Sequence, residues 1–174
     1  MMRIRHVPLG SGHPYTHDTE QRSPVLPVTG EHLRIGARGS GEAASVTVEA
    51  TFTGADGVVI ESAAHKPGRV ATSSPGQRVD IGHLASAQAK QARKAGGWEA
   101  HLTVPTGATQ LAYRIVAAGP DGSTTRTKAF ITEVGTWMAA DAAVVQASGP
   151  VGVVGDVSVL RAPSGLTRVR FALP

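Results

Sequence analysis

Alternating apolar and polar positions begin abruptly after residue 31 and predict a series of β-strands. The alternation is clearest in residues 32–38 and 46–52, where every second side chain is apolar. Shorter or less regular runs follow at residues 58–61, 98–104, 111–117 and 124–134, all separated by turn-forming residues. Six strands at this spacing are typical of an immunoglobulin-like antiparallel β-sandwich. The sequence therefore predicts an all-β fold whose sandwich occupies residues 31–135.

The inward-facing positions of these strands supply enough apolar side chains for one core. The predicted core residues are Leu33, Ile35, Val48, Phe52, Ile60, Leu102, Leu111, Ile115 and Phe130. Composition agrees with this fold class, because only 7 of 174 residues are aromatic while Gly and Pro number 21 and 11. Such a mixture suits short strands joined by many turns better than a helical bundle.

Residues 1–30 interrupt any regular pattern with Pro8, Pro14, Pro24 and Pro27. Proline fixes φ and donates no backbone hydrogen bond, so this stretch cannot form a central strand or a helix. We expect an extended, Pro/Gly-rich arm that lies over a neighbouring surface.

Residues 136–174 show short apolar runs at 142–146, 151–154, 157–160 and 168–173. Their apolar side chains are mainly Val and Ala, with Phe171 the only ring after Trp137. So small a set supports a sheet poorly by itself. We interpret this segment as a short additional β segment, the start of a second and incomplete β domain.

The only helical pattern lies at residues 84–95, which are rich in alanine and end at Gly96-Gly97. The same region is basic: residues 62–96 carry six cationic side chains and one carboxylate, while residues 31–61 are net negative. Nucleic-acid sites usually combine cations with aromatic side chains for base stacking, and residues 62–96 contain none. We therefore predict a solvated basic loop and no nucleic-acid partner.

The chain contains no cysteine, which excludes disulfides, thiol catalysis and zinc–thiolate sites. No run of 18 apolar residues is present, so a membrane-spanning helix and a membrane partner are not expected. Residues 1–10 lack the apolar region of a secretory leader, which predicts a cytoplasmic location.

No catalytic constellation is visible in the sequence. Glycoside hydrolysis needs two carboxyl groups held about 5 to 10 Å apart. The closest sequence pairs are Asp18 with Glu20 and Asp56 with Glu61. Both pairs flank turns, so we interpret them as solvated turn residues and assign no catalytic residue.

Metal and cofactor sites are not predicted either. His6, His13 and His17 cluster in the arm, and imidazoles at such spacings can bind zinc or nickel. No predicted strand or helix fixes their geometry, so packing and hydrogen bonds between segments are the preferred interpretation.

Sugar binding is the remaining functional option, because pyranose rings stack on exposed aromatic side chains. The candidates are Tyr15, Trp98, Tyr113 and Trp137. Tyr113 is expected in the core, and Trp137 is expected to pack at the boundary near Gly135. Trp98 opens a strand beside Gly96-Gly97 and could project to solvent, so it is the one carbohydrate-binding candidate.

Two stretches at opposite ends of the chain are similar to one family. The opening, RHVPLGSGHPY at residues 5–15 with QRSP at 21–24 and PVTGE at 27–31, resembles the start of certain bacterial family 31 glycoside hydrolases. The close, RVRFALP at residues 168–174, resembles the strand that precedes their main sandwich and catalytic barrel. The resemblance implies an accessory domain that ends near Gly135, followed by the start of the N-terminal sandwich of an α-glycosidase or α-glucan transglycosylase.

The family's catalytic carboxylates lie on a (β/α)₈ barrel of at least about 200 residues, which this chain does not contain. None of its residues matches those catalytic motifs, so whether the chain belongs to an enzyme depends on a parent glycoside hydrolase. The leading hypothesis is a non-catalytic region that stabilises a catalytic domain, or shapes access for an α-glucan, in the same polypeptide or another chain. The alternative is a free-standing module that binds a glycan or a protein.

Overall fold

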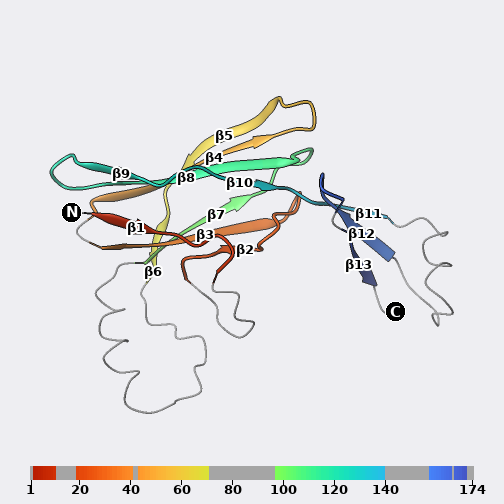
Figure 1. Cartoon of the computed structure of the whole chain (residues 1–174), viewed down its shortest axis with the longest axis horizontal. Helices are drawn as coiled ribbons and strands as arrows, with labels where there is room; N and C mark the ends of the chain where they lie inside the picture. The colour runs from red at the N-terminus through yellow and green to blue at the C-terminus, as the bar shows by residue number, and fades with distance from the viewer. Residues whose placement is uncertain are drawn as a thin grey trace, which may run out of the picture.

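The computed structural model describes residues 2–10, 19–40, 43–70, 97–139, 157–165 and 167–171. The predicted helix at 84–95, the predicted strands at 142–146 and 151–154, and most of the basic segment lie outside these residues. The described part is all-β (Figure 1). It contains no helix long and apolar enough to cross a bilayer.

One sheet, here called the N-terminal sheet, is built around β3 (His32–Ser40). On one side β3 pairs antiparallel with β7 (Gly97–Thr103), which pairs with β6 (Gly68–Val70). On its other side β3 pairs with β1 (Arg3–Arg5) and β2 (Arg22–Ser23). The proline-rich arm thus supplies edge strands, in agreement with the exclusion of a central strand.

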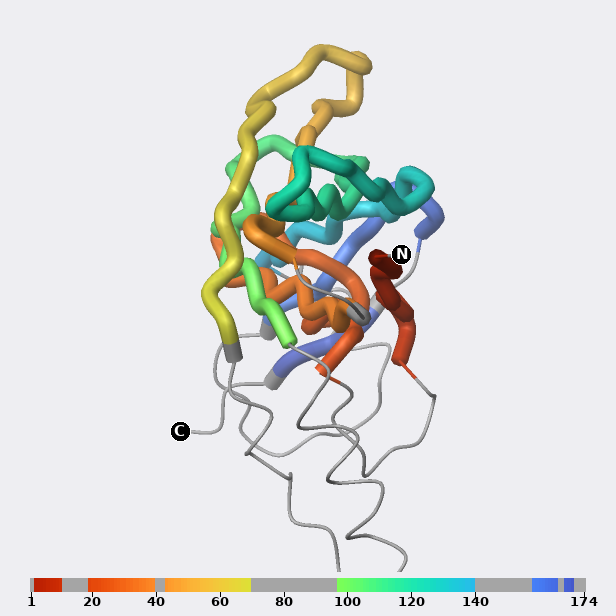
Figure 2. The backbone as a smooth tube through the Cα atoms, turned by 90° about the vertical axis from the view of Figure 1, so that its left-hand side faces the viewer, coloured from red at the N-terminus to blue at the C-terminus, as the bar shows by residue number. Residues whose placement is uncertain are grey.

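The second sheet, here called the hairpin sheet, is centred on β4 (Ser45–Thr53) and β8 (Gln110–Ala118), which pair antiparallel over their full length. β5 (Val59–His65) pairs with the free side of β4 and forms one edge. β9 (Thr124–Arg126) and β10 (Phe130–Glu133) pair with β8 at the other edge. Viewed along the long axis of the molecule, the β4–β5 hairpin extends beyond the body of the sandwich (Figure 2).

The two sheets pack face to face around one hydrophobic core. Alternate residues of β4 and β8 point inward, as their regular buried and less buried positions show. The largest side chains buried almost completely are Tyr113, Phe52, Leu33, Ile35, Leu111 and Ile115. The predicted all-β sandwich is therefore confirmed, because period-2 alternation places one apolar face of each strand in this core.

The structure differs from the sequence predictions in three places. The run at 124–134 forms two short strands, β9 and β10, and the strand β6 lies in a stretch without sequence alternation. Ile60 is 42% exposed and does not face the core. The β4–β5 register shifts between Phe52 and Thr53, so positions beyond the shift no longer follow the inward pattern of β4.

A third sheet, here called the C-terminal sheet, contains β11 (Thr136–Ala139), β12 (Val157–Arg161) and β13 (Thr167–Phe171) in an antiparallel order. It lies at one end of the sandwich (Figure 1). Cross-strand register places Trp137 opposite Leu160, and Met138 opposite Val159. The boundary near Gly135 and the incompleteness of this segment stay predictions.

Candidate functional site

The junction between the sandwich and the C-terminal sheet is a bridge of backbone hydrogen bonds. The Gly135 amide donates to the Pro27 carbonyl at 2.8 Å, and the Thr29 amide donates to the Gly135 carbonyl at 2.9 Å. Val28 and Gly135 accordingly form a parallel β-bridge. The arm therefore holds the chain in place at the point where it leaves the sandwich.

Glycine is required at position 135 because three elements meet there. A Cβ at this position would lie 2.8 Å from Leu160 Cδ1 and 3.3 Å from Leu26 Cδ2. Leu160 is itself buried, so its side chain has little room to move. The close approach joins the arm, the junction and the C-terminal sheet.

Trp137 connects the C-terminal sheet with the start of the sandwich at Glu31. Its indole Nε1–H donates to Glu31 Oε1 at 3.1 Å. The guanidinium carbon of Arg170 lies 4.4 Å from the centroid of the indole ring, within the range of a cation–π interaction. The prediction that Trp137 packs at the boundary is confirmed.

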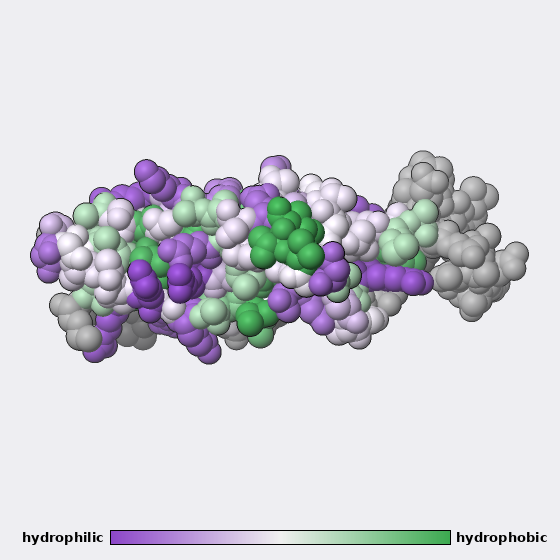
Figure 3. All heavy atoms as spheres, turned by 90° about the horizontal axis from the view of Figure 1, so that it is seen from above, coloured by the Kyte–Doolittle hydropathy of each residue, from purple (hydrophilic) through white to green (hydrophobic). Residues whose placement is uncertain are grey.

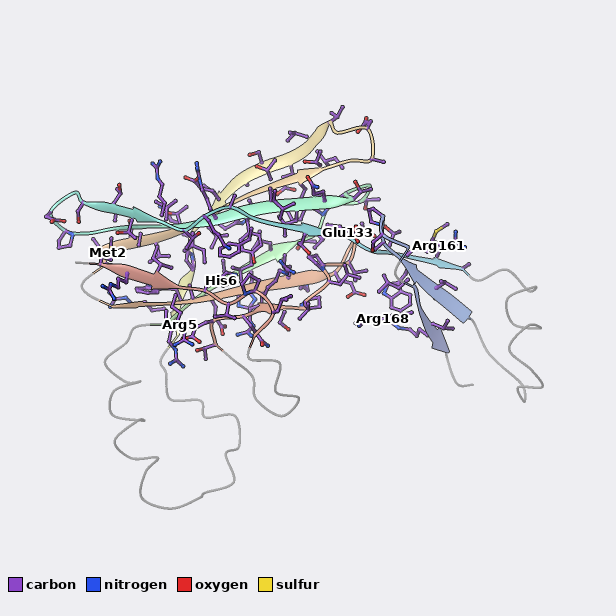
Figure 4. All side chains as sticks on the ribbon, viewed as in Figure 1. Met2, Arg5, His6, Glu133, Arg161 and Arg168 are labelled. Atoms are coloured by element: carbon purple, nitrogen blue, oxygen red, sulfur yellow. The ribbon has the colours of Figure 1, made fainter. Side chains whose placement is uncertain are left out.

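A polar cluster inside the sandwich attaches the arm to both sheets. His6, directly after β1, lies between the two layers (Figure 4). Its Nδ1 is 2.6 Å from the carbonyl oxygen of Gly36 in β3, and its Nε2 is 2.8 Å from the hydroxyl of Tyr113 in β8. The centroid of the His6 ring also lies 4.9 Å from that of the Phe130 ring, with the two ring planes at 77°. One side chain of the arm thus spans the space between the sheets.

The partners of His6 determine its tautomer and its charge. A carbonyl oxygen only accepts, so Nδ1 carries the proton and donates to Gly36, while neutral Nε2 accepts from the Tyr113 hydroxyl. Burial is the main reason that the pKa of His6 is lowered, and the nearby Arg22 charge adds to it. Backbone hydrogen bonds oppose the shift. Burial likewise raises the pKa of the Tyr113 hydroxyl.

Arg22 of β2 completes this cluster although it is only 4% exposed. Its guanidinium donates to the Val25 carbonyl at 2.6 Å and to Thr132 Oγ1 at 3.1 Å. A third, longer contact of 3.4 Å reaches the Tyr113 hydroxyl. A buried guanidinium must satisfy its donors, and here it does so by joining the arm to β8 and β10.

Glu20 is a second buried polar group of the arm. Its carboxylate lies 3.4 Å from the guanidinium of Arg38 and 3.8 Å from that of Arg5. Arg38 also donates to Thr19 Oγ1 at 3.0 Å. These contacts attach the arm to β3 on the side away from the core cluster.

Trp98 does not take the exposed position that its sequence context suggested. It is 7% exposed and belongs to the hydrophobic core. A Cβ on Gly39 would lie 2.5 Å from the indole ring, so the ring lies directly over the glycine backbone of β3. The prediction of a solvent-facing indole is therefore wrong: in this conformation the ring offers no face on which a pyranose could stack.

An open groove of about 550 Å³ lies over the hairpin sheet. Alternating polar and alanine side chains line it, including the ion-paired Glu49 and Arg114 and the hydrogen-bonded Thr51 and Ser62. Tyr113 is the aromatic residue among its lining residues, and its ring is buried. The groove can offer hydrogen bonds to a ligand, but no stacking surface.

The remaining predicted site residues are placed as follows. Asp56 accepts the Val58 amide hydrogen at 3.0 Å, which confirms its interpretation as a turn residue. Among the described residues no group of three or more His, Asp or Glu side chains could hold a metal. His13, His17, Asp18 and Tyr15 lie outside the described residues.

No sequence pattern indicated the role of Arg22 or the link from His6 to Tyr113. An arginine beside Ser23-Pro24 looks like an ordinary surface residue of a loop, and two of its partners, Tyr113 and Thr132, are about 100 residues away in the sequence. Only the packing and hydrogen bonds between segments that were predicted for the arm histidines agree with the contacts of His6.

The profile of the family described as 1,3-alpha-isomaltosidase-like, N-terminal domain, matches residues 10–117. A 1,3-alpha-isomaltosidase of Kribbella flavida is 30% identical over 170 residues, which span 98% of this chain and 22% of the relative. The chain thus corresponds to about a fifth of the length of that relative.

Two solved structures are similar over nearly the whole chain. The cycloalternan-degrading enzyme of Trueperella pyogenes, in complex with cycloalternan, has 24% identity and a TM-score of 0.69, covering 97% of this chain and 23% of that one. A point mutant of Kfla1895 in complex with isomaltose has 27% identity and a TM-score of 0.59, covering 99% and 21%.

Proposed function

Because the chain belongs to the family of 1,3-alpha-isomaltosidase-like N-terminal domains, we propose that it serves as the non-catalytic N-terminal region of a larger carbohydrate-active enzyme. In this role it stabilises the catalytic part of the same polypeptide. The observation that carries the proposal is the extent of the match: nearly the whole chain aligns with about a fifth of a longer enzyme.

The architecture agrees with a supporting role. The junction fixes the departing strand by a backbone bridge at Gly135 and by the contacts of Trp137. A sandwich attached in this way can hold whatever follows β13 in one orientation. The buried polar side chains Glu20 and Arg22, together with His6, attach the arm to the sandwich.

The names of two relatives support a proposal for the substrate class of the parent enzyme. One relative is named for 1,3-alpha-isomaltosidase activity and another for cycloalternan degradation. We infer that the parent acts on an α-glucan that contains isomaltose units, as an α-glycosidase or an α-glucan transglycosylase. The reacting carboxylates would belong to the part that follows this chain.

The test starts with the reading frame beyond residue 174. We expect it to continue into a catalytic barrel, and we expect the longer polypeptide to release sugar from an isomaltose-containing α-glucan. The 174-residue chain should release none. A reading frame that stops at residue 174, or sugar release by the short chain, would overturn the proposal.

A stability measurement distinguishes a stabilising role of this chain from a catalytic role. Gly36→Ala, which displaces the arm, should lower the temperature at which the longer polypeptide loses activity. It should leave kcat/KM unchanged well below that temperature. Gly68→Ala is the matched control, because a Cβ there meets nothing within 4 Å.

The alternative, a free-standing glycan-binding module, makes a different prediction. The groove beside Glu49 and Arg114 would then bind isomaltose in the 174-residue chain. Titration calorimetry should show heat that disappears with Arg114→Ala. Without a stacking platform we expect no binding in the micromolar range, since exposed hydrogen bonds contribute little net affinity in water.

A further inference from the structure

Three consecutive large apolar residues are exposed where the β4–β5 hairpin turns. Val58, Val59 and Ile60 are 60%, 54% and 42% exposed. A single exposed valine is ordinary, but three in succession on one projecting hairpin form a local apolar surface. The view from the hairpin side shows a compact hydrophobic patch on this face (Figure 3).

The turn holds these side chains in a defined conformation. The Gly54 amide donates to the Val58 carbonyl at 2.9 Å, and Asp56 Oδ1 accepts the Val58 amide hydrogen. Gly57 has a φ of 78°, which favours glycine. A Cβ on Gly54 or Gly107 would lie 3.6 or 3.7 Å from Ile60 Cδ1, so the tip of Ile60 rests over both glycines. The apolar surface is therefore preorganised, which reduces the entropic cost of docking.

Backbone hydrogen bonds connect this surface to the point where the chain leaves the sandwich. The Thr109 amide donates to the Thr53 carbonyl at 2.9 Å. The Val134 amide donates to the Thr109 carbonyl, also at 2.9 Å, and Gly135 follows in the chain. The hairpin end and the start of β11 are thus held in a fixed relation through one intervening turn.

The hairpin turns at the end of the sandwich from which the C-terminal sheet extends (Figure 1). Two other exposed large apolar residues, Met138 and Val169, belong to that sheet. In the described part of the chain only Leu9, Val25 and Ile131 are exposed large apolar residues outside these two elements. Five of the eight exposed large apolar residues in the described part therefore belong to the hairpin and the C-terminal sheet.

We propose that Val58, Val59 and Ile60 of the β4–β5 hairpin form the surface on which the part of the polypeptide that follows β13 packs. The inference rests on the proposed function, because it requires a longer polypeptide. The relative of which this chain spans 22% has enough additional chain to cover the surface. β13 ends on the side of the molecule opposite the hairpin end (Figure 1), but a body of that length can reach back and bury an apolar surface at this end of the sandwich without a second molecule.

The absence of cysteine permits a direct test by thiol labelling. Val59→Cys places a thiol on the proposed surface, and Leu9→Cys places one at an apolar residue that is 66% exposed elsewhere. In the 174-residue chain both thiols should react quickly with a maleimide. In the longer polypeptide Val59→Cys should react at least about tenfold more slowly, because a buried thiol reacts only during local opening, while Leu9→Cys is unchanged. Peptide mass spectrometry assigns the label to its position.

A second variant tests burial without a label. Val59→Asp should lower the thermal midpoint of the longer polypeptide and leave that of the 174-residue chain unchanged, since the charge is desolvated only in the former. Equal labelling of both cysteines in the longer polypeptide would overturn the assigned surface and leave the proposed function intact. A reading frame that ends at residue 174 would overturn both. Concentration-dependent protection of Val59→Cys in the short chain would assign the surface to a second copy instead.

Discussion

The Nε2 atom of His6 lies 2.8 Å from the hydroxyl oxygen of Tyr113, although the two residues are 107 positions apart in the chain. Tyr113 belongs to the middle of β8 in the hairpin sheet, whereas His6 follows an edge strand of the N-terminal sheet. Since Nδ1 of the same ring donates to Gly36, His6 connects the two layers of the sandwich in its neutral form.

This arrangement makes the stability of the chain depend on pH. Burial lowers the pKa of His6 below its usual 6.5, so the unfolded chain binds this proton more readily than the folded one. Stability is full above pH 6.5 and falls as the pH drops from about 6.5 toward the lowered pKa of the folded state. Urea unfolding between pH 7.5 and about 5 should show a loss that His6→Gln removes.

The chain contains six other histidines, so a control is needed. His101 has a side chain that is 66% exposed. His101→Gln should therefore leave the pH dependence as it is in the parent chain. Identical pH profiles for His6→Gln and the parent chain would argue against the neutral bridging role.

The buried guanidinium of Arg22 should tolerate no substitution by lysine. A single ammonium group cannot reach Val25, Thr132 and Tyr113 together. Acceptors that lose their donors in the interior cost about 1 to 3 kcal/mol, and we expect Arg22→Lys to destabilise the chain by about 2 kcal/mol in urea unfolding.

Arg114→Lys is the comparison for that experiment, because the Arg114 side chain is 47% exposed and its guanidinium pairs with Glu49 on the outer face. Exposed ion pairs contribute about 0 to 1 kcal/mol, so this variant should change stability by less than Arg22→Lys. Equal losses for the two variants would mean that the interior contacts of Arg22 are not important for stability.

Gly36→Ala should detach the arm from β3. A Cβ at this position would lie 1.8 Å from the carbonyl oxygen of Thr19, a backbone atom that cannot move without the arm. Overpacking of this kind costs about 1 to 3 kcal/mol or more. We expect faster proteolysis of residues 19–23 in Gly36→Ala and unchanged proteolysis in Gly68→Ala, whose Cβ would be in open space.

Amide exchange tests the predicted boundary near Gly135. β4 is a central strand of a five-stranded sheet. β12 is flanked by the short strands β11 and β13 in a three-stranded sheet, and β13 is an edge strand. We expect amides of β12 and β13 to exchange faster than those of β4, since local opening costs less where few apolar contacts are lost. Equal protection in a monomer would show that the C-terminal sheet is integral to the sandwich.

The fold was predictable to the extent that alternation reports burial. Leu33, Phe52 and Ile115 face the core because their strands are covered on one face along their whole length. Ile60 was wrongly predicted to face the core. It belongs to the edge strand β5, and the register of β5 with β4 shifts near the start of β5, which no sequence pattern indicates. Edge position and bulges depend on which strands pair, and that is a tertiary property.

The candidate site was less predictable for a related reason. Trp137 was assigned to the junction because it lies two residues after Gly135. Trp98 was assigned to solvent from its neighbouring glycines, but Gly39, a distant glycine of β3, makes the space that buries it. Arg22 lies far in the sequence from Tyr113 and Thr132, so no local pattern could connect it with them.

The distance in sequence between the arm and its partners also sets an order of events during synthesis. His6 is made 107 residues before Tyr113. At a synthesis rate of about 5 to 20 residues per second, roughly 5 to 20 s pass between the synthesis of His6 and that of Tyr113. Nascent chains that end before β8 must therefore carry an undocked amino-terminal segment, open to chaperones and proteases until the second half of the sandwich has emerged.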